Sequence, residues 1–209
     1  MRGNGADPVT TAPPAGGTGR EWQVIIGGEG GQGVVLAGAL LGEAAVRAGL
    51  NATHTSAYGI ATRGGFTRSD VVVAPADREI AYPRVRHPDL MVALSGDAYA
   101  RLLAMCRPGA ILIREAGLSG VAASADGGPG GATPRCREMA LPLEQAAGQA
   151  GGPRTINMVA LGAVLGATGM FPPAFLEEVL RHRFGAGRGE TNCRAVRAGY
   201  HLATGHQGA

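Results

Sequence analysis

Apolar residues recur along this chain in two patterns that alternate through its first half. Short runs rich in Val, Ile and Leu, bounded by glycine, proline or polar residues, predict strands, and longer apolar stretches at helical spacing predict helices. The predicted strands are 22–27, 51–56, 69–74, 90–94, 110–113 and, at the sheet edge, 136–141. The predicted helices are 33–49, 97–105, a short one from 142, then 155–168, 173–184 and 190–204. We therefore expect an α/β fold of three layers, with a mostly parallel, Rossmann-like sheet, helices on both faces and a helical C-terminal part.

The chain has 209 residues, a length typical of one compact domain, which we place at 21–204. Residues 1–20 are rich in Gly, Pro, Thr and Ala and lack the apolar segment of a signal peptide, so we expect a flexible arm. Gly, Ala, Ser and Pro also predominate at 119–134, where we expect a flexible loop. Residues 205–209 form a short tail.

The longest uncharged stretch, 155–176, contains Asn157 and ends near the pair Pro172-Pro173. Its apolar part is too short for a membrane-spanning helix, which needs about 20 apolar residues, so we expect a buried helix instead. Gly162 and Gly166 would let another backbone approach this helix closely. We expect it to contact partner chains, and the isolated chain to aggregate without them.

Composition excludes several classes of function. All 19 basic residues are arginines scattered along the chain, the net charge is only +3 and aromatic residues make up 4%, which together disfavour nucleic-acid binding. The absence of lysine excludes a P-loop lysine and a Schiff base. Three distant cysteines suit a reducing cytoplasm and cannot hold an iron–sulfur cluster or zinc, and we expect Cys106 and Cys193 to be buried helix residues. Ser69 shows no His/Asp pairing in the sequence, which disfavours a hydrolase.

A glycine loop joins the first predicted strand to the first predicted helix. Its sequence, Gly28-Glu29-Gly30-Gly31-Gln32-Gly33, satisfies the G-x-G-x-x-G pattern of dinucleotide-binding proteins, in which backbone N–H groups approach an anion at a helix N-terminus. That pattern also requires an acidic residue at the end of the second strand, and none lies between Glu43 and Asp70. An NAD(P)-binding dehydrogenase therefore remains only an alternative, as does a tight turn without a ligand. The amide of Gln32 favours contact with a ligand or a partner backbone.

A second loop follows the second predicted strand and contains Tyr58-Gly59 and Arg63-Gly64-Gly65. It should open at the same carboxyl edge of the sheet as the glycine loop, so both loops should face one crevice. There the planar guanidinium of Arg63 could bind a carboxylate, phosphate or carbonyl group. Alternatively, Arg63 pairs with a neighbouring carboxylate and Tyr58 packs on the sheet edge.

These loops and three further segments together resemble a known family. In order along residues 21–203, the chain resembles the gamma subunit of 2-oxoacid:ferredoxin oxidoreductases, which also occurs as a domain of larger chains. The segments that carry the resemblance are Gly28-x-Gly-Gly-Gln-Gly33, Tyr58-Gly59 with Arg63-Gly64-Gly65, Tyr82-Pro83 with Pro88-Asp89-Leu90 and Ala93-Leu94-Ser95, and Asn157-Met-Val-Ala-Leu-Gly162.

The resemblance implies a subunit of an enzyme that oxidatively decarboxylates a 2-oxoacid, usually to an acyl-CoA, and passes electrons to ferredoxin. It implies alpha and beta partners that hold thiamine diphosphate and Mg²⁺, with [4Fe-4S] clusters in other chains, including a ferredoxin-like subunit. This chain would be cytoplasmic, inactive alone, and without metal or catalytic residues of its own. The cofactor-binding residues expected are Gly28, Gly30, Gly31, Gln32, Gly33, Tyr58, Gly59, Arg63, Gly64, Gly65 and Asn157.

Two positions depart from the pattern of this family. Many relatives acting on 2-oxoglutarate or pyruvate have Ser where Ala57 stands and an acidic residue where Ala61 stands. The substrate therefore stays open between these acids and aryl 2-oxoacids such as indolepyruvate or phenylglyoxylate.

Overall fold

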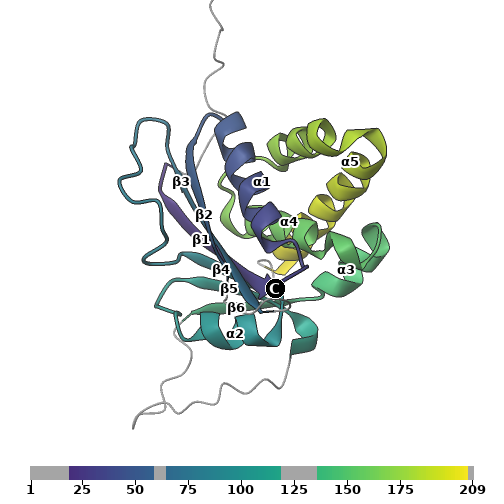
Figure 1. The fold of residues 1–209 in the computed structure, drawn as a ribbon, viewed down its shortest axis with the longest axis horizontal. Helices are drawn as coiled ribbons and strands as arrows, with labels where there is room; N and C mark the ends of the chain where they lie inside the picture. Colours follow the sequence, from purple (N-terminus) through teal and green to yellow (C-terminus); the bar gives the residue numbers. More distant parts are fainter. Residues whose placement is uncertain (1–18, 59–64, 119–135, 207–209) are drawn as a thin grey trace, which may run out of the picture.

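The computed structural model describes residues 19–58, 65–118 and 136–206, which form a six-stranded sheet covered by helices (Figure 1). The strands are β1 (Trp22–Glu29), β2 (Asn51–Tyr58), β3 (Phe66–Ala74), β4 (Leu90–Ala93), β5 (Ile111–Glu115) and β6 (Arg137–Leu141). Their order across the sheet is β2-β3-β1-β4-β5-β6. β1, β4, β5 and β6 pair in parallel, whereas β3 runs antiparallel to both β1 and β2. The sheet is therefore mixed, because the short connection from β2 to β3 can join only antiparallel neighbours.

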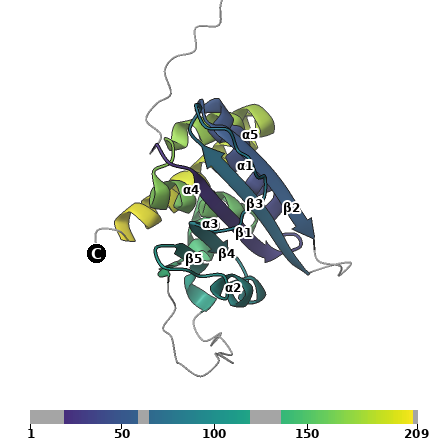
Figure 2. The ribbon, with the colours of Figure 1, turned by 90° about the vertical axis from the view of Figure 1, so that its left-hand side faces the viewer.

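The helices cover both faces of the sheet, as predicted. They are α1 (Val34–Arg47), α2 (Gly96–Leu103), α3 (Leu143–Ala150), α4 (Ile156–Thr168) and α5 (Pro173–His206), with short 3₁₀ turns at Ala116–Leu118 and Pro153–Thr155. Side chains alternate along β1, so that Val24 and Ile26 pack under α1, α3, α4 and α5 while Ile25 packs against α2. Figures 1 and 2 show α2 on the opposite side of the sheet from the other helices. The expected α/β fold is confirmed.

Helix α4 is buried along nearly its whole length, but the chain itself supplies the cover. A Cβ at Gly162 would collide with the backbone of Val196 in α5, and one at Gly199 would collide with the backbone of Val159 in α4. The small residues therefore bring α4 and α5 together within one chain. This corrects the expectation that the apolar stretch needs a partner chain, while the prediction of a buried helix is confirmed. Among the described helices, none is long and apolar enough to cross a membrane.

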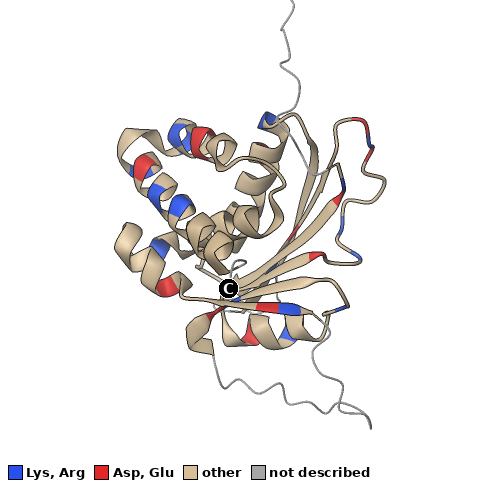
Figure 3. Cartoon of the chain, turned by 180° about the vertical axis from the view of Figure 1, so that it is seen from behind, with Lys and Arg blue, Asp and Glu red and all other residues tan. Residues whose placement is uncertain are grey.

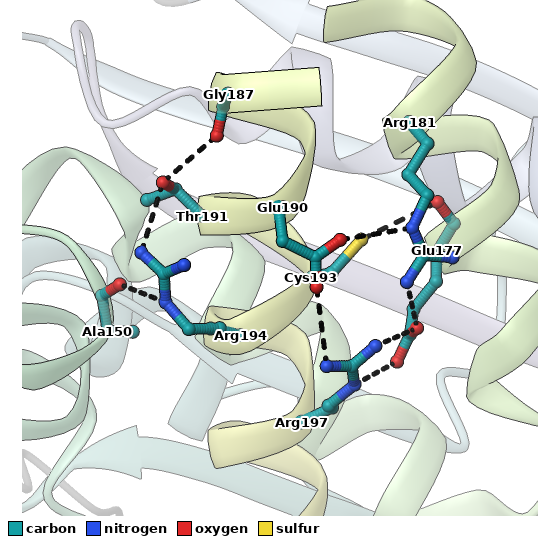
Figure 4. A network of polar contacts seen from close by, with 9 residues as sticks. All are labelled: Ala150, Glu177, Arg181, Gly187, Glu190, Thr191, Cys193, Arg194 and Arg197. Atoms are coloured by element: carbon teal, nitrogen blue, oxygen red, sulfur yellow. Dashed lines mark hydrogen bonds and ion pairs between the residues drawn. The ribbon is translucent and has the colours of Figure 1, made fainter. Parts of the chain in front are cut away.

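Helix α5 consists of two segments, 173–184 and 186–206, separated by a non-helical residue at Gly185 with φ of 71°. This agrees with the two helices predicted from the sequence. Figure 3 shows basic and acidic positions mixed along α5, and Figure 4 shows how some of them join its segments. Glu177 in the first segment accepts hydrogen bonds from Arg181 Nη2 at 2.9 Å and from Arg197 Nε, in the second segment, at 2.7 Å. Arg181 and Arg197 also both contact Glu190.

Cys106 differs from the prediction, because it is only partly buried, lies outside a helix and forms a disulfide, a bond that is rare in a reducing cytoplasm. Cys106 follows the end of α2 instead of lying within it, and it forms a disulfide with Cys136, with 5.4 Å between their Cα atoms. Parallel pairing of β5 with β6 places Arg137 opposite Ile111, which brings the start of β6 beside the turn that holds Cys106. The 30-residue separation gave no local sign of this contact. Cys193 is free and buried, as predicted.

Candidate functional site

The glycine loop needs glycine for its backbone geometry. Gly31 and Gly33 have φ of 102° and 74°, a region that L side chains rarely adopt. A Cβ at Gly28 would lie only 2.5 Å from Gln32 Oε1. Gly33 is the N-cap of α1 and no side chain in the described parts of the chain caps this helix, so its first N–H groups face the loop. Such a helix start favours an anionic group.

The side chain of Gln32 closes this loop from within. Its Oε1 accepts a hydrogen bond from the N–H of Glu29 at 2.7 Å, and its Nε2 donates to the carbonyl of Leu94, just after β4, at 3.0 Å. The amide therefore joins the glycine loop to the neighbouring parallel strand. This contact explains why a long amide stands among the glycines, and the ligand contact expected of Gln32 stays a prediction.

The two loops meet, as their positions after β1 and β2 predict. The N–H of Gly30 donates to the carbonyl of Gly65 at 3.1 Å. Tyr58 is the last residue of β2 and so stands where the second loop begins. Gly59, Arg63 and Gly64 lie outside the described residues, and their roles stay predictions.

Asn157 is brought to the same place from the other end of the chain. It lies in the first turn of α4 with only 4% of its surface exposed, and its Nδ2 donates to the carbonyl of Gly33 at 3.2 Å. A Cβ at Gly33 would collide with this amide, so glycine is required there for space as well as for φ. Asn157 Oδ1 is buried and has no hydrogen-bond partner among the described residues.

Two hollows flank the glycine loop. One, of about 320 Å³, is bounded by Gly30, Gly31, Gly33 and, from β3, Thr67. The other, of about 520 Å³, lies between Gly31 and Gln32 on one side and Glu144, Pro153, Arg154 and Ile156 on the other. We call the two hollows, which both border Gly31, the crevice. The facing of the two loops across it stays a prediction, because residues 59–64 lie outside the described ranges.

Arg154 is a site residue that the sequence analysis missed. Its side chain is exposed beside the larger hollow, and no hydrogen bond or ion pair joins it to the rest of the described chain. The only sign of it in the sequence is its position three residues before Asn157, which the resemblance already marks as a site residue. It gives the crevice a positive charge, although Glu144 lies at the same hollow, so an anion would bind on the Gly31 and Arg154 side.

The fold also pairs Ser69 with a histidine, which the sequence did not indicate. His54 Nε2 lies 2.7 Å from Ser69 Oγ. Ser69 is fully buried beneath α1, where a Cβ at Gly38 would collide with its hydroxyl, so no substrate can reach it. Burial lowers the pKa of His54 below its ordinary value, against the opposing charge of Asp70. We therefore assign the pair of His54 and Ser69 a structural role. Separately, the described residues contain no cluster of His, Cys, Asp or Glu that could hold a metal.

The fold and this site define an α/β protein with a glycine loop at the carboxyl edge of a mixed sheet. Residues 23–202 match the family described as "Pyruvate ferredoxin/flavodoxin oxidoreductase", and the chain belongs to this family. The resemblance inferred from the sequence is thereby confirmed.

The relatives and solved structures that match this chain agree with this family assignment. The chain is 36% identical over 185 residues to the 2-oxoglutarate synthase subunit KorC of Methanothermobacter thermautotrophicus, covering 86% of this chain and 94% of that protein. It is 25% identical to the gamma subunit of a keto/oxoacid ferredoxin oxidoreductase from Geobacter sulfurreducens, with a TM-score of 0.72 over 88% of this chain and 99% of that one.

A third comparison is with a longer chain. The 2-oxoglutarate:ferredoxin oxidoreductase from Magnetococcus marinus, solved with 2-oxoglutarate, coenzyme A and succinyl-CoA bound, matches with a TM-score of 0.74 and 25% identity, over 89% of this chain and 31% of that chain. The unit is thus part of a larger polypeptide in that enzyme. These relatives do not favour the NAD(P)-dependent alternative.

Proposed function

We propose that this chain is the gamma subunit of an enzyme that oxidatively decarboxylates 2-oxoglutarate, forms succinyl-CoA and passes the electrons to ferredoxin. The observation that carries this proposal is the similarity to KorC along 94% of that subunit's length. The bound molecules of the Magnetococcus marinus enzyme support the choice of 2-oxoglutarate over aryl 2-oxoacids.

In this proposal the chemistry belongs to the assembled enzyme. Alpha and beta subunits hold thiamine diphosphate and Mg²⁺, and a ferredoxin-like subunit carries [4Fe-4S] clusters, all in the cytoplasm. The part of this chain that the structure describes offers a different contribution, which is a crevice with backbone donors and a cation. The donor set fits an anionic group, because the start of α1 and Arg154 both favour negative charge.

We assign this crevice to an anionic group of coenzyme A. The hollow of about 520 Å³ has the volume of an ordinary small-molecule site. Gly31, Gln32 and Arg154 would hold the group, and Arg63 would add a second cation from the facing loop. The competing occupant is an acidic loop of a partner chain.

Kinetics of the whole complex test both assignments. The partners are first identified by pull-down of the tagged chain and mass spectrometry, and the complex is then purified with Arg154→Ala or Arg63→Ala. Loss of a hydrogen bond to a charged group amounts to about 1.5–3 kcal/mol, so the KM for CoA should rise roughly 10- to 150-fold while the KM for 2-oxoglutarate stays the same. The control is Arg78→Ala, an exposed arginine in the loop after β3.

Two results would contradict these proposals. Unchanged kinetics with weakened assembly would make the crevice a protein contact. Partner chains unrelated to 2-oxoacid oxidoreductases, or a complex that does not oxidise 2-oxoglutarate, would reject the function itself.

A further inference from the structure

A third hollow, of about 460 Å³, lies on the other side of Asn157 from the crevice. It opens between the start of α4, the first turns of α1 and the beginning of the second segment of α5, and we call it the Arg188 pocket. Its lining residues are Leu36, Gly151, Arg154, Thr155, Asn157, Met158, Phe184, Gly187, Arg188, Thr191 and Asn192. It shares Arg154 and Leu36 with the crevice, whereas Arg188 and Asn192 line this pocket alone.

The pocket collects polar side chains that the fold does not use. Arg154, Arg188 and Asn192 make no side-chain hydrogen bond or ion pair with any residue in the described ranges. Elsewhere on α5, Arg181 and Arg197 are held by carboxylates. No Asp or Glu lines the pocket, so the two guanidinium groups leave it positively charged.

The second segment of α5 adds to the positive potential of the Arg188 pocket and forms one of its walls. Arg188 and Asn192 stand in the first turns of the segment that begins after Gly185, where the helix dipole favours an anion. Figure 4 shows Arg194 tied to the carbonyl of Ala150 at 3.3 Å and to Thr191 Oγ1 at 3.2 Å. The bond to Ala150 joins α5 to the end of α3, and the bond within α5 holds Thr191, a lining residue of the pocket.

Asn157 supplies a hydrogen-bond acceptor, whereas the arginines supply donors. Its Nδ2 donates to the carbonyl of Gly33, so the amide cannot be turned round without placing oxygen against oxygen. The remaining Oδ1 is therefore a buried acceptor that lacks a donor among the described residues. A buried polar atom of this kind is normally satisfied. Less than 1 Å² of Oδ1 is exposed, so a ligand hydroxyl or N–H at this wall would bond to it only after the wall shifts.

We propose that the Arg188 pocket binds an organic phosphate that carries a hydroxyl group, of the size of a nucleoside monophosphate. The phosphate lies between Arg154 and Arg188, the guanidinium fork being suited to its oxygens. The hydroxyl faces Asn157, and the apolar part of the ligand lies on Leu36 and Phe184. This inference does not rest on the proposed role in 2-oxoglutarate oxidation.

Calorimetry on the full chain with adenosine 5′-monophosphate (AMP) tests the proposal. We expect one saturable site, with adenosine and inorganic phosphate each binding at least tenfold more weakly than AMP. Arg188→Ala should weaken AMP at least tenfold, and Arg78→Ala should leave it unchanged. Gly187→Leu provides a second test without removing charge, because a Cβ there meets no atom within 4 Å and the side chain would fill the pocket.

The proposal is overturned if AMP shows no saturable binding to the folded chain, if adenosine binds as well as AMP, or if both pocket variants bind AMP normally. A parallel measurement separates it from the proposed function. In the assembled complex Arg188→Ala should leave the KM for CoA unchanged, and a rise equal to that of Arg154→Ala would show that the pocket is only an extension of the crevice.

Discussion

Replacing Glu177 by Gln should destabilise the fold more than any other change of a single charge on α5. Glu177 has only 9% of its surface exposed, and it joins Arg181 of its own segment to Arg197 of the segment beyond Gly185. Burial alone would raise the pKa of this carboxyl, but hydrogen bonds and charge from Arg197 and then Arg181 outweigh it and hold the pKa below its ordinary value. The carboxylate therefore contributes to stability in its charged form.

The magnitude follows from these contacts. Glutamine keeps the shape but loses the charge, and each hydrogen bond to a charged group contributes about 1.5–3 kcal/mol. Arg181 and Arg197 are 44% and 45% exposed and retain contacts with Glu190, so water compensates part of the loss. We expect the free energy of unfolding to fall by about 2 kcal/mol at pH 7.

Urea denaturation followed by circular dichroism measures this change. The matched control is Glu178→Gln at the next position, whose ion pair with Arg47 is exposed on both sides and should contribute under about 0.5 kcal/mol. Because the native pKa of Glu177 lies below its unfolded value of 4.5, its contribution is complete above that pH and is lost as the pH falls through the native pKa. The difference between the natural chain and Glu177→Gln should therefore shrink below pH 4.5. Equal effects of the two substitutions at pH 7 would refute the reasoning.

Two further predictions concern His54 and the disulfide. Because burial holds the native pKa of His54 below the unfolded value of 6.5, the chain should lose stability as the pH falls from 6.5 towards that lower pKa, and His54→Gln should lessen this dependence in urea titrations at pH 7.5 and 5.5. The exposed His201→Gln serves as the control, and an unaltered pH dependence in His54→Gln would contradict the prediction. Cys106→Ser should lower the free energy of unfolding by about 3–4 kcal/mol without reductant, from the entropy of a 30-residue loop, and by far less with dithiothreitol. The same loss in both buffers would mean that the disulfide is not responsible.

Local pattern predicted the elements of this fold well, because strand and helix periods are properties of neighbouring residues. The break at Gly185 was visible as an interruption between two helical stretches, and the contact between Gly30 and Gly65 followed from loops after strands of the same direction. Pairing between distant residues was harder. The place of β3 between β1 and β2 and the bond between Cys106 and Cys136 depend on which strands become neighbours, which no local pattern records.

In the candidate site, too, single residues could be picked out from the sequence, but their contacts with distant residues could not. Resemblance indicated Asn157, but only the fold shows that its amide holds Gly33. Arg154 and Arg188 are ordinary arginines in the sequence, and they become candidates only because the structure leaves them without carboxylate partners among the residues it describes. Gln32 was recognised as unusual, and its bond to Leu94 required the position of β4.

That bond between Gln32 and Leu94 decides how a ligand can approach the sheet. The chain leaves β1 towards β2 on one side, while the next parallel strand, β4, lies on the other, so the strand order reverses at the glycine loop. In open α/β sheets such a reversal leaves a natural gap at the carboxyl ends of the two strands. Here the side-chain amide of Gln32 bridges that gap through its hydrogen bonds to Glu29 and Leu94. A ligand held by this loop would therefore lie beside this bridge, in one of the two hollows that border Gly31, and not between β1 and β4.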